Sequence, residues 1–201
     1  ELIRDNMSEL LSYVETQNLL DELPDEHQKL VGEVVPNQIS VGGIQRVLQN
    51  LLNERVSIRD LPTILEGISE ACAFTRNVTQ LTEHVRSRLS RQISEQNSTE
   101  DNFIPLVTLS AEWEQIFSDS ILDQGEDKQL SMAPSQLQRF IGAVRTTLDE
   151  LADIEDPPVV LTSPLARPFV RSIIERFRPA TSIMSQNELH PKAKIKTLGQ
   201  I

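Results

Sequence analysis

The chain has 201 residues, a length that accommodates one large domain or two small ones. Its net charge of -11 disfavours nucleic acid as a partner, because phosphates are repelled unless basic residues are concentrated in one patch. The single cysteine, Cys72, excludes an intramolecular disulfide, and no apolar run approaches the ~20 residues that a membrane-spanning helix needs.

The first 38 residues predict short amphipathic helices that end at prolines. We expect a weakly amphipathic helix over Glu1–Ser12 and a second helix over Val14–Leu23. A third helix, Glu26–Val35, is expected to have Asp25 as its N-cap. Aromatic residues make up only 4% of the chain, so the cores that these helices form must be mainly aliphatic.

The stretch Ile39–Cys72 predicts a helical hairpin, around which we expect the first half of the chain to fold. Ser40 and Asp60 are the predicted N-caps of its two helices, and Asn53–Arg59 is a polar turn between them. Apolar residues recur at spacings of three and four, which places them on one face of each helix. They are Val41, Ile44, Val47, Leu48, Leu51 and Leu52 in the first helix, and Leu61, Ile64, Leu65, Ile68 and Cys72 in the second.

A long helix and a change of composition follow the hairpin. Asn77 is the predicted cap of a helix that runs from Val78 to about Gln96, with Arg86, Arg88 and Arg91 directed outward. The segment SEQNSTEDN at 94–102 is polar and lacks large apolar side chains, which is typical of a domain boundary. We therefore expect a helical domain at residues 1–97, a linker at 98–102 and an α/β domain at 103–201.

The second half begins with a β-prone segment, Phe103–Leu109. Ser110 is expected to cap a helix over Ala111–Leu122, and Asp123–Ser131 is expected to be a flexible loop. Pro134 then begins a helix that extends to about residue 154.

Apolar segments alternate with a helix in the last 50 residues. Val159–Leu161 predicts a strand that is covered on both faces. A helix is expected from Ser163 to about Arg178, with further strands over Thr181–Gln186 and Ala193–Leu198. Strand, helix and strand in succession favour a parallel pair with a right-handed crossover. The predicted fold class is α+β: an N-terminal all-helical domain followed by a small α/β domain with a short, mainly parallel sheet.

Catalytic and metal-binding patterns are missing from the sequence. The histidines His27, His84 and His190 lack metal-ligand spacing, and Gly42–Gly43 lacks the strand and lysine of a phosphate loop. Thr162–Ser163 could bind an anion at a helix N-terminus, although helix capping is the simpler interpretation. We expect no enzymatic activity, no cofactor and no metal.

Charge is distributed unevenly along the chain. Residues 1–38 have nine acidic and two basic side chains, whereas residues 164–201 have seven basic and two acidic ones. Acidic pairs such as Glu112 and Glu114 are most simply solubilising charge. The two charged ends are either solvated faces or surfaces through which neighbouring copies attract one another.

Several stretches resemble the cytoplasmic region of FlhA, the flagellar type III export-gate family, and its injectisome counterparts. They are TQNLLDELPDEHQKLVGEVV at Thr16–Val35, QRVLQNLLNERVSIRDLPTILE at Gln45–Glu66, PVVLTSPLARPFVRSIIERF at Pro158–Phe177 and IMSQNELHPKAKIKTLGQI at Ile183–Ile201. The similarity covers nearly the whole chain. Val35–Pro36 and the run Val47–Leu52 resemble flagellar members more than injectisome members.

The resemblance implies that the chain is part of a longer protein, namely the third and fourth subdomains of its cytoplasmic region. Such a region lies at the cytoplasmic face of the bacterial inner membrane and forms a nine-membered ring. The implied partners are other copies of the chain, further components of the export apparatus and chaperone–substrate complexes, with no nucleic acid. The alternatives are an injectisome export gate, a helical adaptor that binds one partner, and a nucleotide-binding α/β module.

The polar residues of the most specific stretch are the predicted protomer interface. They are Arg46, Gln49, Asn50, Arg55, Arg59 and Asp60. Arg55 and Arg59 are expected to pair with acidic residues of the neighbour within Asp21–Glu33, because the guanidinium fork binds a carboxylate with two hydrogen bonds. Asp60 has the competing role of helix cap.

Overall fold

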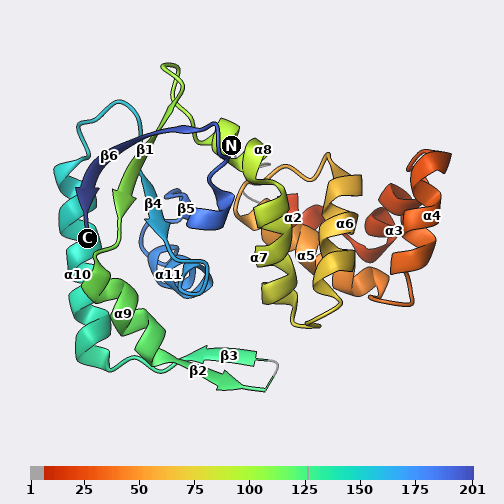
Figure 1. Ribbon diagram of the computed structural model, residues 1–201, viewed down its shortest axis with the longest axis horizontal. Coiled ribbons are helices and arrows are strands. Elements are labelled where there is room, and N and C mark those ends of the chain that lie inside the picture. Colours follow the sequence, from red (N-terminus) through yellow and green to blue (C-terminus); the bar gives the residue numbers. More distant parts are fainter. Residues whose placement is uncertain (1–6, 126) are drawn as a thin grey trace. The chain divides into compact units, whose positions relative to one another are not determined.

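The computed structural model describes residues 7–125 and 127–201, which form two compact units divided between Leu89 and Ser90 (Figure 1). The first unit is helical and the second is built on a parallel sheet, which confirms the α+β class. Half of the predicted helix Glu1–Ser12 lies outside the described residues. Its described part contains a single helical turn, α2 (Met7–Leu10), and Ser12 instead caps the helix that follows.

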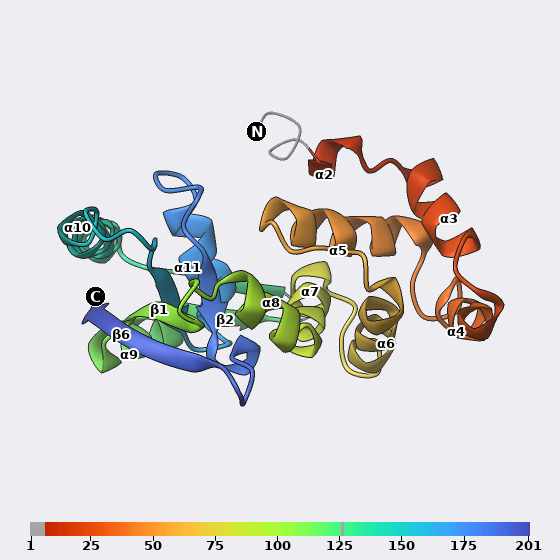
Figure 2. The same ribbon diagram turned by 90° about the horizontal axis from the view of Figure 1, so that it is seen from above.

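The described residues of the first unit form five further helices. They are α3 (Tyr13–Asp21), α4 (Asp25–Val34), α5 (Val41–Asn53), α6 (Leu61–Ala71) and α7 (Val78–Arg88). In Figure 2, α5 is seen from the side whereas α6 is seen nearly end-on, so the two helices of the predicted hairpin cross steeply. The helix α5 packs against α2, α3 and α7, and α6 packs against α4 and α7.

In the helical unit, local sequence signals place three of the four predicted helix caps correctly. Ser40 accepts a hydrogen bond from the Gly43 amide at 3.1 Å, and Asp60 and Asn77 cap α6 and α7 in the same manner. Asp25 is not a cap, because α4 already includes it and Pro24 occupies the N-cap position. Its carboxylate in the first turn still complements the positive end of the helix dipole.

The predicted apolar stripes of the hairpin are buried as expected. All eleven side chains of the two stripes have less than a tenth of their surface exposed, and Val56 in the connecting turn is buried with them. Cys72 lies in this core, where its thiol is 3.9 Å from the Gln38 carbonyl oxygen.

The prediction of one long helix over Val78–Gln96 is wrong in one respect, because the structure has two helices there. The helix α7 ends at Arg88, and α8 (Ser90–Gln96) begins after Leu89. The predicted stripe residues Leu81, Val85, Leu89 and Ile93 are buried across this break. The apolar period therefore persists although the helix does not.

In the second unit, four parallel strands form a sheet in the order β5-β4-β1-β6. They are β1 (Phe103–Thr108), β4 (Val159–Thr162), β5 (Ile183–Ser185) and β6 (Lys194–Gln200), accompanied by α9 (Ala111–Ser120), α10 (Pro134–Glu150), α11 (Arg167–Ile174) and the short 3-10 helix η1 (Gln186–Glu188). Val107, Val160 and Ile183 are paired across the sheet and share a core with residues of all three α-helices.

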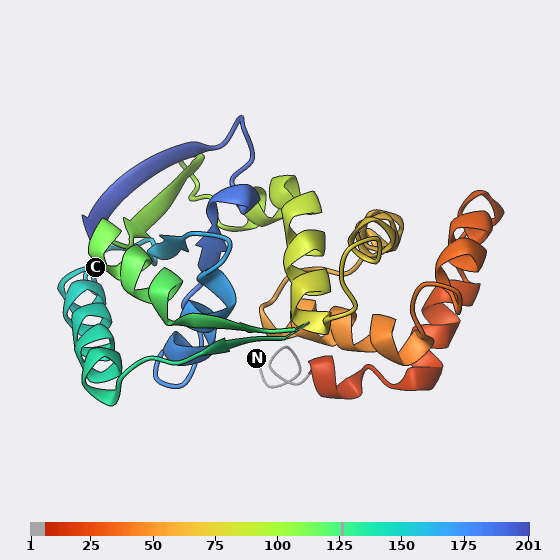
Figure 3. The same ribbon diagram turned by 60° about the horizontal axis from the view of Figure 1, so that its bottom comes forward.

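The segment Asp123–Ser131 was expected to be a flexible loop, but most of it belongs to a β-hairpin. The strands β2 (Ile121–Gln124) and β3 (Asp127–Leu130) pair antiparallel, and Figure 3 shows them as a ribbon separate from the main sheet. Gly125 adopts φ 73° at the tip, a conformation that glycine adopts without strain. The helix α9 consequently ends at Ser120, before the predicted Leu122.

The short helix α8 belongs to the second compact unit. The Ser94 hydroxyl donates to the Glu188 carbonyl at 3.0 Å and accepts from the His190 amide at 2.9 Å. These bonds join α8 to the segment that follows β5. The chain passes from the first compact unit to the second between Leu89 and Ser90. The domain boundary at residues 98–102 stays a prediction.

Candidate protomer interface

The predicted interface residues lie on the α5–α6 hairpin, and its three arginines are exposed. Arg46 is on α5, and Arg55 and Arg59 are in the turn that leads to α6. None of these three side chains is buried. All three lie at the margin of the hydrophobic core. The hairpin therefore presents a positively charged edge on a unit whose N-terminal helices are acidic.

The backbone fixes Arg55 at the end of α5. Its φ of 59° lies in the left-handed region, and the amides of Arg55 and Val56 donate to the carbonyls of Leu52 and Leu51, both at 2.9 Å. This pair of bonds is a Schellman motif, in which the left-handed position is usually glycine. An arginine there costs about 1 kcal/mol relative to glycine. Strained positions are concentrated at functional sites, so this arginine is a functional candidate.

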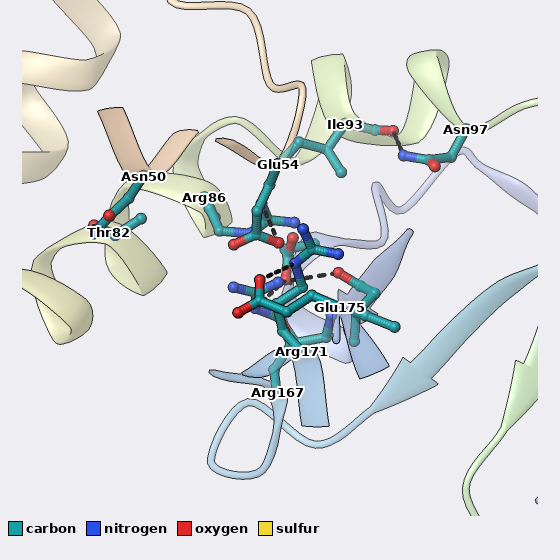
Figure 4. A network of polar contacts seen from close by, with 12 residues as sticks. Asn50, Glu54, Thr82, Arg86, Ile93, Asn97, Arg167, Arg171 and Glu175 are labelled. Atoms are coloured by element: carbon teal, nitrogen blue, oxygen red, sulfur yellow. Dashed lines mark hydrogen bonds and ion pairs between the residues drawn. The ribbon is translucent and has the colours of Figure 1, made fainter. Parts of the chain in front are cut away.

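Three of the predicted interface residues also make side-chain bonds within the protomer: Asp60 caps α6, and Gln49 and Asn50 bind other elements of the unit. The side-chain amide of Gln49 donates to the Leu11 carbonyl at 3.1 Å. That of Asn50 donates to the Thr82 hydroxyl at 3.2 Å, and Figure 4 shows these two residues. Gln49 and Asn50 are both half-buried, and both hold α5 against its own unit. The interface role of these two residues stays a prediction, and the exposed arginines are its stronger members.

Acidic side chains are exposed on α3, α4 and the turn between them. The exposed members of the predicted region are Asp21, Glu22, Asp25, Glu26 and Glu33. Lys29 is the only basic side chain other than histidine in this region, and its ammonium is 3.9 Å from the Glu33 carboxylate. One unit therefore has an acidic surface on α3–α4 and a basic edge on α5–α6. Two different, complementary surfaces are what a head-to-tail ring contact requires.

The structure corrects the predicted orientation of Arg86. It was expected to point outward, but only 3% of its side chain is exposed, and its Nη1 lies 3.3 Å from the Glu54 carboxylate (Figure 4). Arg86 follows Thr82 by four residues, so the two share a face beside the apolar stripe, and Thr82 is buried as well. The pair joins α7 to Glu54, the residue after α5, which lies directly before Arg55 in the chain.

The α/β unit fills its own anion-binding position. One carboxylate oxygen of Glu114 accepts from the Thr162 hydroxyl at 2.8 Å and from the Ser163 amide at 2.9 Å. The sequence analysis interpreted Glu114 as solubilising charge. The structure shows that it instead accepts two hydrogen bonds at the end of β4. The Ser163 hydroxyl also accepts from the Ala166 amide at 3.3 Å, but this bond lies in the turn before α11, whose N-cap is Ala166 and has no side-chain cap bond. The predicted capping of the helix by Thr162–Ser163 is therefore wrong. A phosphate at the end of β4 would meet this carboxylate, which argues against nucleotide binding there.

A second buried ion pair also escaped the sequence analysis. Arg167 and Glu188 have only 2% and 1% of their side chains exposed, with Nε and Oε2 3.6 Å apart. Arg167 donates to the Ile183 carbonyl at 3.1 Å, and Glu188 accepts from the Ser185 amide at 2.8 Å. The only signal in the sequence is the position of Arg167 directly after Ala166 in an apolar segment, which is not diagnostic.

The described residues offer neither a metal site nor a membrane-spanning helix. Within residues 7–125 and 127–201, no three histidine, cysteine or carboxylate residues gather to hold a metal ion. Over the same residues, no helix has the length and apolar character needed to cross a membrane.

Comparisons with known proteins agree with the resemblance. Residues 1–194 match the FHIPEP family. Flagellar biosynthesis protein FlhA of Caulobacter vibrioides is 53% identical over all 201 residues, which are 29% of that protein. Nonameric SctV-C from EPEC has a TM-score of 0.87 at 27% identity, and Chlamydia pneumoniae CdsV in complex with CdsO has 0.89 at 28%. This chain is covered completely in both cases and spans 60% and 58% of those chains.

Proposed function

The chain belongs to the FHIPEP family, and we propose that it is the ring-forming part of the export gate of a flagellar type III protein export apparatus. It would act without catalysis, by assembling with identical copies and with other components of the apparatus. The single observation that carries this proposal is the pair of complementary charged surfaces on the helical unit, combined with the nonameric state of the similar SctV-C.

The flagellar assignment is supported by the degree of similarity. Identity is 53% to a flagellar FlhA and 27% to SctV-C. An injectisome gate is the alternative function. The chain spans less than a third of the length of the FlhA relative, so the activity and the partners of a whole export gate are part of this proposal.

Further partners are proposed on the same basis. The solved complex of Chlamydia pneumoniae CdsV with CdsO supports binding of a further protein by members of this family. Chaperone–substrate complexes are also proposed partners. The proposed location is the cytoplasmic face of the bacterial inner membrane.

Charge reversal in the full-length protein tests the ring contact. Arg59→Glu is expected to weaken assembly and motility while the helical unit stays folded, because a carboxylate would face the acidic surface of the neighbour. Arg55→Gly is the sharper variant, since it removes the charge and relieves the left-handed strain. We expect Arg55→Gly to leave stability equal or raise it by about 1 kcal/mol, and to impair assembly.

A control variant, a compensating double variant and a crosslinking readout complete the test. Arg176→Glu reverses an exposed arginine of the other unit and serves as the matched control, which should assemble normally. Combining Arg59→Glu with Asp25→Arg should restore part of the assembly if the two surfaces meet. Crosslinking of protomers in membranes provides the readout. Wild-type crosslinking and swimming of both Arg59→Glu and Arg55→Gly would overturn the assignment.

The rival functions predict different results. A nucleotide-binding module would be stabilised against heat by nucleotide or phosphate. An adaptor would form a one-to-one complex with its partner instead of a ring.

A further inference from the structure

The two edges of the parallel sheet differ in exposure. All three residues of β5, at one edge, are buried. The strand β6, at the other edge, has seven residues and pairs only with β1, and its residues Lys194 to Thr197 are exposed. An edge strand presents backbone amides and carbonyls that a further strand can pair with. Of the two edges, only β6 offers both length and access.

Basic side chains gather at this edge. The chain has only five lysines, and three of them, Lys192, Lys194 and Lys196, are exposed on β6 or directly before it. None of the ion pairs among the described residues includes any of the three, whereas Lys29 and Lys128 are each 3.9 Å from a carboxylate. In a chain with a net charge of -11, this is a local surface of the opposite sign.

An apolar side chain lies between the strand lysines. Ile195 is 54% exposed and points to the opposite face from Lys194 and Lys196, because side chains alternate along a strand. The Lys196 ammonium is 5.2 Å from the centre of the Phe103 ring, which holds that side chain along the face it shares with β1. The edge therefore combines backbone hydrogen-bonding groups, positive charge on one face and an apolar contact on the other.

We propose that the exposed edge of β6 binds an extended acidic peptide segment of a partner protein by strand addition. Backbone pairing supplies affinity, and alternate side chains supply specificity. Lysines on an edge strand oppose pairing with a second copy of the same strand, because like charges would then lie side by side. They favour an extended segment in which acidic residues alternate with apolar ones. This surface is separate from the arginines of the proposed ring contact.

A peptide of matched length tests the proposal directly. The probe is a fluorescein-labelled seven-residue peptide of alternating glutamate and valine, and its binding to the whole chain is followed by fluorescence anisotropy. We expect saturable binding that weakens with salt, and hydrogen-exchange protection of the β6 amides in the complex. The double variant Lys194→Glu/Lys196→Glu should weaken binding by about tenfold or more.

Two controls separate strand addition from simple charge attraction. The variant Lys29→Glu/Lys128→Glu reverses two exposed lysines elsewhere and should bind like wild type. A probe with the same side chains and N-methylated alternate amides retains its charge but cannot pair along the edge, so its binding should be lost. Far-UV circular dichroism confirms that both double variants are folded.

Several results would contradict peptide binding at the β6 edge. Equal affinity of the N-methylated probe, or unchanged binding by Lys194→Glu/Lys196→Glu, would show that β6 is not the pairing edge. Absence of peptide binding would overturn the proposal. So would binding only to vesicles rich in phosphatidylglycerol, because that result would assign the lysines to an anionic membrane surface.

Discussion

Individual residues show why polar positions were harder to predict than apolar ones. Arg86 and Arg167 lie in amphipathic segments where an arginine is usually exposed, yet both are buried beside a carboxylate. Their partners, Glu54 and Glu188, are 32 and 21 residues away in the chain. A helical period indicates which face is apolar, but it gives no information about a partner on another element.

The Arg167–Glu188 pair leads to a prediction about stability. Arg167→Ala leaves a buried carboxylate without its cation and should lower the free energy of unfolding by about 3–5 kcal/mol. Arg176→Ala, at an exposed position just after α11, should change it by less than about 0.5 kcal/mol. Urea unfolding followed by circular dichroism gives both values. A loss below about 1 kcal/mol in Arg167→Ala would contradict a stabilising role of this pair.

At the scale of elements, helix packing depends on one glycine in α6. A Cβ at Gly67 would lie 3.3 Å from Val85 Cα, so α6 and α7 approach closely at this point. In α4, a Cβ at Gly32 would meet nothing within 4 Å. The two glycines are alike in the sequence, because each lies within an amphipathic helix, and only the neighbouring element distinguishes them.

Substitution of these glycines should therefore have opposite effects. Gly67→Leu should destabilise the chain by about 1–3 kcal/mol, because the larger side chain pushes α6 away from α7. Gly32→Ala should stabilise it by about 0.5–1 kcal/mol, since alanine loses less conformational freedom in a helix. Thermal unfolding of the two variants beside wild type measures the contrast. Equal changes in both would mean that the close approach at Gly67 has no energetic importance.

The same scale explains the errors in element boundaries. The break at Leu89 leaves the apolar period intact, so periodicity could not reveal it. The hairpin β2–β3 was predicted as a loop because its segment is polar and contains a glycine. A two-stranded ribbon is only marginally stable alone, and its residues give little apolar signal.

For the whole molecule, the division into units predicts how fragments behave. Residues 1–89 should fold alone with a cooperative thermal transition, because they contain the buried stripes of α5 and α6. A fragment of residues 90–201 should be more stable than one of residues 98–201, since only the longer one includes Ile93 and the Ser94 hydrogen bonds. Urea midpoints of the two fragments measure the difference. Equal midpoints would support the predicted boundary at 98–102 over a unit that begins at Ser90.

The sequence by itself determined the α+β class, the order of the helices and strands apart from the β2–β3 hairpin and the break at Leu89, three of the four helix caps that it indicated in the helical unit, and the family. These features follow from local or periodic patterns, in which the spacing of apolar residues and the chemistry of a capping side chain act within a few positions. Only the tertiary structure decided that Arg86 and Arg167 are buried, that Glu114 fills an anion site, and that β6 is the exposed edge of the sheet. Each of these depends on groups from segments far apart in the chain, and the free energy of a charge or a strand edge is set by what folding places beside it.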